Sequence, residues 1–196
     1  MPKRTAKKAI SIFYSYAHED SKMQQSLHQA LKSLRRSRKF KISEWYDGCI
    51  PPGREWEKAI INNLKRSDVV LLLLNPAFID SKYCYEKELE WALKRHKDGA
   101  ALVIPVLLKD VAWRDRKFSP YQAIPRDEKG AKPVIRWRPQ SAAWDRVCKQ
   151  LKREIQDLVD GGLVSDANKM SRTMQDMSNE EIERLSTKDK VNSENI

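Results

Sequence analysis

Side chains that could bind or transform a small molecule gather in three short polar segments of the chain. They are Tyr16, His18, Asp47, Tyr83, Glu86 and Glu88. A carboxylate can stabilise positive charge that develops during a reaction. An aromatic ring can hold a flat ligand. These residue types indicate a site without defining its reaction.

Motifs of several familiar site types are missing from the sequence. It contains no glycine-rich dinucleotide fingerprint, no phosphate-binding loop and no Gly-x-Ser-x-Gly turn. The three histidines, His18, His28 and His96, do not pair with cysteines at the spacing of metal ligands. We therefore expect neither a metal nor a resident cofactor, and we interpret Cys84 as a packing residue.

The segments that must position these side chains alternate between strand-like and helix-like patterns. Short β-branched or apolar runs predict strands, and apolar residues at helical spacing predict the helices between them. The expected strands are 9–16, 40–46, 68–74, 101–108 and 134–137. Four helices are expected. The first contains Met23 to Leu34, the second contains Trp56 to Leu64, the third starts at Asp80–Ser81, and the fourth spans 141–159.

This alternation predicts an α/β fold of the flavodoxin-like, three-layer kind, with a five-stranded parallel sheet in the order 2-1-3-4-5. One domain is expected over residues 9–160. Residues 1–8 read as a basic flexible arm, and residues 161–196 as a polar tail. A capping-box pattern at 178–181 allows a short helix in that tail.

A parallel sheet of this order predicts where the site lies. Ligands bind beyond the carboxyl ends of the strands, where the strand order reverses. The reversal falls between the first and third strands, at loops 15–20 and 75–81, and loop 47–53 can fold over the same crevice. Strand alternation directs one of Ser15 and Tyr16 to the crevice and the other to the core.

Charge and cysteine content indicate which partners and which cellular compartment to expect. The 196 residues carry a net charge of +11, and residues 1–40 hold ten Lys/Arg against two Asp/Glu. Because these basic residues follow a helix and are not interleaved with aromatics, we interpret them as a solvated face and do not expect direct nucleic-acid binding. Three scattered cysteines, the lack of a signal-like segment and the lack of a long apolar run favour a cytoplasmic protein that does not enter a membrane.

Four ordered blocks between residues 9 and 159 resemble the Toll/interleukin-1 receptor (TIR) domain family, particularly its bacterial NAD⁺-cleaving members. The first block is 12–20, with Ser15-Tyr16 followed by a polar run. The second, 45–56, is similar to the family's BB loop, which here contains Ile50, Pro51, Pro52 and Gly53. The third is 74–89, and the fourth is 134–137, near the family's late tryptophan box.

The resemblance implies an NAD⁺ glycohydrolase or cyclase that needs no cofactor besides its NAD⁺ substrate. It selects Glu88 as the catalytic residue, while helical geometry alone leaves Glu86 open. It implies substrate binding by Ser15, Tyr16, Asp47 and Tyr83. We interpret Trp45 and Trp56 as structural flanks of the loop.

The resemblance also implies assembly. The BB loop is expected to mediate self-association through TIR–TIR contacts, with a separate sensor or effector protein as a further partner in signalling or immune defence. The alternative function is a non-catalytic TIR interaction or adaptor module.

Overall fold

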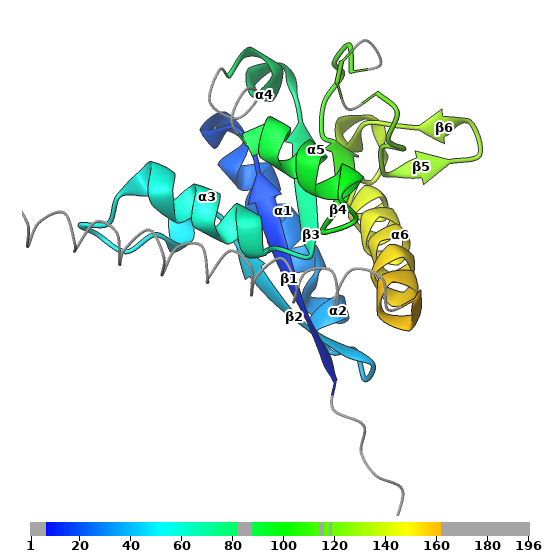
Figure 1. Cartoon of the computed structure of the whole chain (residues 1–196). Coiled ribbons are helices and arrows are strands. Elements are labelled where there is room, and N and C mark those ends of the chain that lie inside the picture. The colour runs from blue at the N-terminus through cyan, green and yellow to red at the C-terminus, as the bar shows by residue number, and fades with distance from the viewer. Residues whose placement is uncertain (1–6, 82–87, 114–115, 118, 162–196) are drawn as a thin grey trace, which may run out of the picture.

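Strand β3 (Val69–Leu74) consists of six apolar residues that are all buried, because helices cover both faces of the sheet at this strand. The computed structural model describes residues 7–81, 88–113, 116–117 and 119–161. Within these residues the main sheet has four parallel strands in the order β2-β1-β3-β4, as Figure 1 shows. The other strands are β1 (Lys8–Ser15), β2 (Phe40–Trp45) and β4 (Leu102–Leu107). The register places Ile12 opposite Val69, and Val70 opposite Val103. The predicted fold class is confirmed.

Helices occupy both faces of this sheet (Figure 1). They are α1 (Ser21–Ala30), α2 (Lys32–Arg35), α3 (Trp56–Arg66), α4 (Pro76–Asp80), α5 (Leu89–Lys97) and α6 (Gln140–Gly161). One apolar cluster joins the sheet to α1, α2 and α6, and a second joins it to α3, α4 and α5. Tyr14 belongs to the first cluster and Phe13 to the second, as strand alternation requires.

Short elements connect the helices and strands. They are the 3₁₀ turns η1 (His18–Asp20), η2 (Asp47–Cys49) and η4 (Val134–Arg136), and a two-stranded hairpin of β5 (Arg126–Asp127) and β6 (Gly130–Ala131). Turns η1 and η2 directly follow β1 and β2. Their residues therefore lie just beyond the carboxyl ends of those two strands.

The predicted fifth strand at 134–137 is wrong, because residues 134–136 form η4. Pro133 precedes this turn, and Val134 is fully buried in the core without joining the sheet. Ile124 occupies the edge beside β4 instead. Its N–H donates to Pro105 O at 2.8 Å, and Leu107 N–H donates to Ile124 O at 2.7 Å. The edge of the sheet thus holds a single bridging residue where the sequence pattern predicted a strand.

Two described helices flank the helix start that the sequence predicts at Asp80–Ser81. Asn75 caps the short helix α4, with Pro76 in its first turn, and α4 ends at Asp80. Helix α5 begins at Leu89. Residues 82–87, and the tail predicted to contain a short helix at 178–185, lie outside the described residues. No helix among the described residues has the length and apolar character needed to cross a membrane.

Candidate functional site

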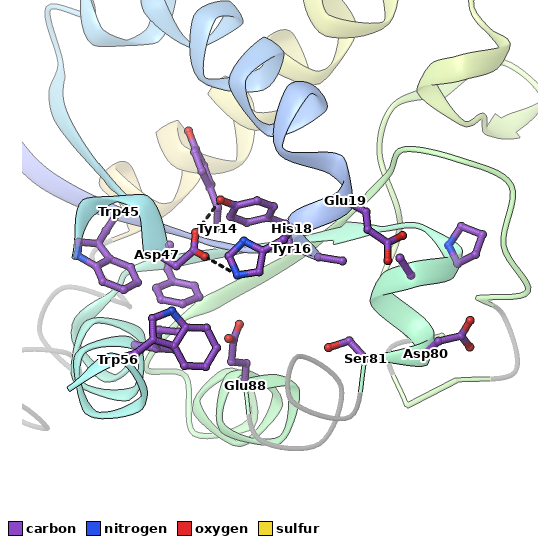
Figure 2. A pocket seen from close by; sticks show the side chains of 15 residues that line it. Tyr14, Tyr16, His18, Glu19, Trp45, Asp47, Trp56, Asp80, Ser81 and Glu88 are labelled. Atoms are coloured by element: carbon purple, nitrogen blue, oxygen red, sulfur yellow. Dashed lines mark hydrogen bonds and ion pairs between the residues drawn. The ribbon is translucent and has the colours of Figure 1, made fainter. Parts of the chain in front are cut away.

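A pocket of about 650 Å³ opens at the carboxyl ends of β1 and β3, on the side where the strand order reverses (Figure 2). Its walls come from η1, the end of β2 with η2, the start of α3, the helix α4 and the residue preceding α5. The described residues that line it are Phe13, Tyr14, Tyr16, Ala17, His18, Glu19, Trp45, Asp47, Trp56, Ile60, Pro76, Ala77, Asp80, Ser81 and Glu88. The pocket lies where the topology predicted the site.

Glu88 is the most buried carboxylate that lines the pocket, with 4% of its surface exposed. Ser15, the last residue of β1, donates a hydrogen bond from Oγ to Glu88 Oε2 at 2.5 Å. Burial raises the pKa of Glu88 to about 7, the Ser15 hydrogen bond opposes this rise, and the charge of Asp47 adds to it. Glu88 is therefore a carboxylate whose charge changes near neutral pH, and it is not a solvated residue of the helix surface.

Asp47 connects the loop after β2 to the loop after β1. Its Oδ1 accepts hydrogen bonds from Tyr16 Oη at 2.6 Å and from Gly48 N at 2.9 Å, and its Oδ2 lies 3.1 Å from His18 Nε2. The pKa of Tyr16 is raised, first by burial and then by its hydrogen bond to Asp47. Figure 2 shows this carboxylate between the two rings, so Asp47 both shapes the pocket wall and fixes their orientation.

Two tryptophans form one end of the pocket (Figure 2). Trp45 stacks on Phe13 with ring centroids 5.2 Å apart and an angle of 18° between the planes. Trp56 is 42% exposed although it is a large apolar residue, and it stands at the first position of α3. Sequence reasoning gave both residues a structural role and missed their place in the pocket wall. Their position on each side of the 47–53 loop was the signal that could have found them.

The opposite end of the pocket is polar. Glu19 in η1, Asp80 at the end of α4 and Ser81 line it, as Figure 2 shows. The sequence analysis singled out none of these three residues. Glu19 and Asp80 are exposed polar residues in the predicted site loops, and nothing distinguishes their types from ordinary turn residues.

The structure brings together four of the predicted site residues: Ser15, Tyr16, Asp47 and Glu88. Tyr83 and Glu86 lie outside the described residues. Both Ser15 and Tyr16 contribute to the site: Ser15 is buried and bonds to Glu88, while Tyr16 lines the pocket.

The BB loop lies beside the aromatic end of the pocket. Ile50 is half-buried and packs on the apolar cluster that contains Phe13 and Trp45, while Pro51, Pro52 and Gly53 are exposed. Gly53 has φ of 80°, a conformation that residues with a Cβ rarely adopt. Among the described residues, no group of three or more His, Cys, Asp or Glu side chains is placed to hold a metal ion.

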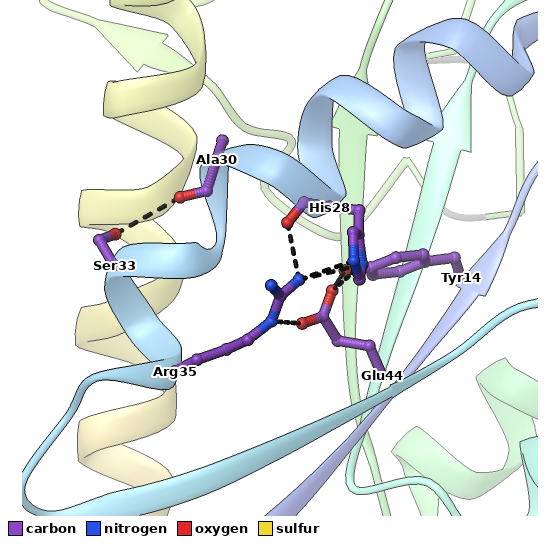
Figure 3. A network of polar contacts seen from close by, with 6 residues as sticks. All are labelled: Tyr14, His28, Ala30, Ser33, Arg35 and Glu44. Atoms are coloured by element: carbon purple, nitrogen blue, oxygen red, sulfur yellow. Dashed lines mark hydrogen bonds and ion pairs between the residues drawn. The ribbon is translucent and has the colours of Figure 1, made fainter.

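A partly buried polar network around Glu44 contacts Tyr14, a residue of the pocket wall (Figure 3). Glu44 in β2 accepts a hydrogen bond from Tyr14 Oη, pairs with Arg35 Nε at 2.6 Å and lies 2.9 Å from His28 Nδ1. Burial would raise the pKa of Glu44, but the hydrogen bonds from Arg35 and Tyr14 lower it overall. Tyr14 also lines the pocket, so this network holds β1, β2 and the α1–α2 segment in place around the site.

Comparison with known proteins gives consistent results. A family profile described as TIR domain matches residues 12–154. The uncharacterized protein y4lF of Sinorhizobium fredii (strain NBRC 101917 / NGR234) is 34% identical over 142 residues, which are 72% of this chain and 42% of that protein. This chain therefore spans less than half the length of that relative.

A solved structure has the same fold. The TIR domain of the Toll-related receptor TRR-2 from Hydra magnipapillata superposes with a TM-score of 0.51 at 17% identity, over 74% of this chain and 97% of that domain. The family match covers most of the described domain, including the second half of β1, all of η2 and α5, and every described residue of the pocket wall. The chain belongs to the TIR-domain family.

Proposed function

We propose that this TIR domain cleaves the nicotinamide–ribose bond of NAD⁺. One observation carries the proposal: Glu88 is buried in the wall of a pocket large enough for a small-molecule ligand, and Ser15 holds its carboxylate. Ser15, Tyr16 and Asp47 are the substrate-binding residues of this proposal, together with Tyr83 and the described aromatic wall. NAD⁺ is the substrate, and the proposed reaction needs no other cofactor.

The chemistry requires a group that stabilises positive charge. When the C1′–N bond breaks, nicotinamide leaves as a neutral molecule with the bonding electron pair, and positive charge develops on the ribose. An ionised Glu88 close to C1′ would stabilise that charge. Water then forms the new bond to C1′ and releases a proton, which gives ADP-ribose. Attack by an adenine nitrogen in place of water gives a cyclic isomer.

The aromatic end of the pocket gives the proposal its second support. Trp45 and Trp56 present flat apolar surfaces in a pocket that also holds carboxylates. Such surfaces suit a pyridinium or purine ring. The polar side chains of Tyr16, Asp47 and Glu88 in the pocket wall suit the hydroxyls of a ribose.

We also propose that self-association controls the activity. The exposed BB-loop residues Pro51, Pro52 and Gly53 adjoin the aromatic end of the pocket, so a neighbouring copy bound there would lie next to the site. Proline at two successive positions restricts the loop and lowers the entropy cost of forming such a contact. A separate sensor or effector protein would supply the trigger in signalling or defence.

The exposed loop also supports the alternative function, a non-catalytic interaction module. In that function the same residues would bind another TIR domain, and Glu88 would only be a buried structural carboxylate. The two functions differ in what replacing Glu88 does, so one experiment separates them.

The experiment follows NAD⁺ and its products by chromatography with concentrated protein, both free and clustered on a support. Glu88→Gln should lower the rate about 10²-fold to 10³-fold, as expected for loss of a group that stabilises the transition state. The matched control is Glu90→Gln, because Glu90 is an exposed neighbour on α5 that pairs with Lys117. Glu90→Gln should keep the rate.

Each outcome has a defined meaning. Product formation by wild type and by Glu90→Gln, but not by Glu88→Gln, supports the enzyme and the residue together. Equal activity of Glu88→Gln and wild type would transfer the assignment to Glu86, which Glu86→Gln tests. No turnover by clustered wild-type protein would refute the enzyme and leave the interaction module.

A further inference from the structure

The described residues of the pocket wall carry a charge opposite to that of the chain as a whole. The chain has 38 Lys/Arg, 27 Asp/Glu and a net charge of +11. Yet none of the described residues that line the pocket is Lys or Arg, and four of them are carboxylates: Glu19, Asp47, Asp80 and Glu88. The described part of the pocket wall is therefore acidic, although the protein as a whole is basic.

The four carboxylates lie around the cavity and not on one helix face (Figure 2). Glu19 comes from η1, Asp47 from η2, Asp80 from the end of α4, and Glu88 from the residue before α5. A ligand in the pocket therefore has negative charge on several sides, and low-dielectric walls strengthen the field inside such a cavity.

Within the described wall, little positive charge lies near the four carboxylates. Asp47 lies beside His18, whose side chain is 73% exposed, and so faces solvent at the mouth. Lys109, which follows β4, pairs with the buried carboxylate of Asp20 in η1 at 2.6 Å, and neither residue is among the described residues that line the pocket. Buried Glu88 is held by the neutral hydroxyl of Ser15.

This charge pattern constrains which part of a substrate enters the pocket. Resting on the proposed function, the ribose C1′ must lie beside Glu88, so the base attached to C1′ lies inside the acidic cavity in any orientation. A pyridinium ring is cationic and is attracted by the carboxylates and by the faces of Trp45 and Trp56. An anionic substituent on the same ring is repelled.

We propose that the acidic pocket wall is a specificity determinant that selects a cationic pyridinium with a neutral carboxamide and rejects the same ring with a carboxylate. Glu19 and Asp80 extend this selectivity beyond the residues that would touch C1′. The preferred substrate class is the nicotinamide dinucleotide, and the rejected class is the nicotinic acid dinucleotide.

A matched pair of small probes tests the selectivity without any turnover. 1-Methylnicotinamide and 1-methylnicotinate have the same ring and N-methyl group, and they differ only in carboxamide against carboxylate. Their dissociation constants can be measured by NMR titration at pH 8 and low salt. Wild type should bind the carboxamide about tenfold tighter, since several partly screened charges act together.

Variants identify the residues responsible. Glu19→Gln and Asp80→Asn should each reduce the carboxamide preference about twofold to threefold, and the double variant should reduce it further. Raising the salt to 0.5 M should reduce it as well. Glu90→Gln is the matched control, because Glu90 is a surface carboxylate outside the pocket wall, and its preference should equal that of wild type.

Equal affinity for the two probes in wild type, a preference for the carboxylate, or binding of neither probe would overturn the proposal. An unchanged preference in the Glu19→Gln, Asp80→Asn double variant would overturn the role of those two residues. NAD⁺ cleavage is measured in a separate experiment, by chromatography of the products. Selective binding without cleavage refutes only the proposed function, and cleavage without selective binding refutes only the specificity.

Discussion

Ser15 Oγ donates a hydrogen bond to Glu88 Oε2 at 2.5 Å, although the two residues are 73 positions apart in the chain. The last residue of the central strand β1 thus contacts the residue before helix α5. Because the hydroxyl donates to the carboxylate, it stabilises the ionised form of Glu88. Burial has the largest effect on the pKa of Glu88 and raises it, and the strand-end hydroxyl of Ser15 opposes that rise.

Ser15→Ala should raise the pKa of Glu88 further above about 7, because burial then acts without the opposing hydrogen bond. If the ionised carboxylate is the active form, the acid limb of kcat/KM moves to higher pH, and activity at pH 7 falls about threefold to tenfold. The measurement is a pH–rate profile. Ser26→Ala is the control, because Ser26 is an exposed serine on α1 whose hydroxyl donates to Lys22 O within the same helix. An unshifted acid limb in Ser15→Ala would contradict the prediction.

Asp47→Asn should shift the same limb in the opposite direction. The negative charge of Asp47 raises the pKa of Glu88, so removing it lowers that pKa. Asparagine retains a side-chain oxygen that can accept the hydrogen bond from Tyr16, so the position of the Tyr16 ring in the pocket wall should change little. Tyr16→Phe removes the 2.6 Å hydrogen bond and keeps the charge of Asp47, so it separates geometry from electrostatics. If the acid limb moved in the same direction in Ser15→Ala and Asp47→Asn, the opposing effects of these two residues on the pKa of Glu88 would be excluded.

Glu88→Gln should make the folded domain more stable at alkaline pH. The pKa of Glu88 is about 7 in the folded chain against an ordinary value of 4.5, so the folded state binds the proton more tightly. The contribution of the glutamate is fully present below pH 4.5 and is lost as the pH rises through 7. At pH 8 the loss amounts to about 3 kcal/mol.

Urea unfolding at several pH values measures this difference. Glu88→Gln should be more stable than wild type by up to about 3 kcal/mol at pH 8, and the advantage should disappear toward pH 4.5. Glu90→Gln should follow the wild-type curve. A constant difference between Glu88→Gln and wild type at every pH would show that charge is not its cause.

Glu44→Gln should destabilise the domain, with the opposite dependence on pH. The side chain of Glu44 is 4% exposed and its partner Arg35 is 31% exposed, so the variant leaves a partly buried guanidinium without its carboxylate. We expect a loss of about 2 kcal/mol at pH 7. The pKa of Glu44 is lowered in the folded state, so its stabilisation is present above pH 4.5 and is lost as the pH falls through the folded pKa.

The same urea series gives the measurement for Glu44. Glu154→Gln is its control, because Glu154 forms an exposed pair with Arg153 on α6. That control should change the free energy of unfolding by less than about 0.5 kcal/mol. Equal losses in Glu44→Gln and Glu154→Gln would mean that the network in Figure 3 adds little to stability.

Pro51→Ala should weaken self-association while the domain stays folded. Pro51 is exposed, so its replacement removes no core packing, but it increases the freedom of the BB loop before contact. Activity at fixed protein concentration should fall severalfold, and the curve of specific activity against concentration should move to higher concentration. Pro120→Ala, at another exposed proline, should leave that curve in place. Full activity of Pro51→Ala in dilute solution would rule out a role for the loop in activation.

The strands of the central sheet were predictable because their sequence pattern is strong. The segment 68–74 is almost continuously apolar, and β3 occupies Val69–Leu74. The segment 134–137 also contains β-branched and aromatic residues, but it has only four residues, one of them Arg136, and Pro133 precedes it. A run this short does not determine its own conformation, and burial of Val134 was satisfied by a 3₁₀ turn.

The site was predictable in location and only partly in composition. Loops at the ends of parallel strands must meet at one edge, so Ser15, Tyr16 and Asp47 could be grouped from the sequence. The burial of Glu88 could not be derived from helical periodicity, because it depends on the start of α5 packing against the end of β1. The wall formed by Trp45 and Trp56 depends on the path of the 47–53 loop, which residue types alone do not specify.

The proline in β4 has a consequence for how copies of this chain can meet. Pro105 O accepts from Ile124 at the outer edge of the sheet, and Pro105 has no N–H to offer there. An incoming strand would find one donor missing and the neighbouring positions already taken by Ile124. Copies are therefore hindered from extending one another's sheet at β4, the route by which open edges polymerise into fibres.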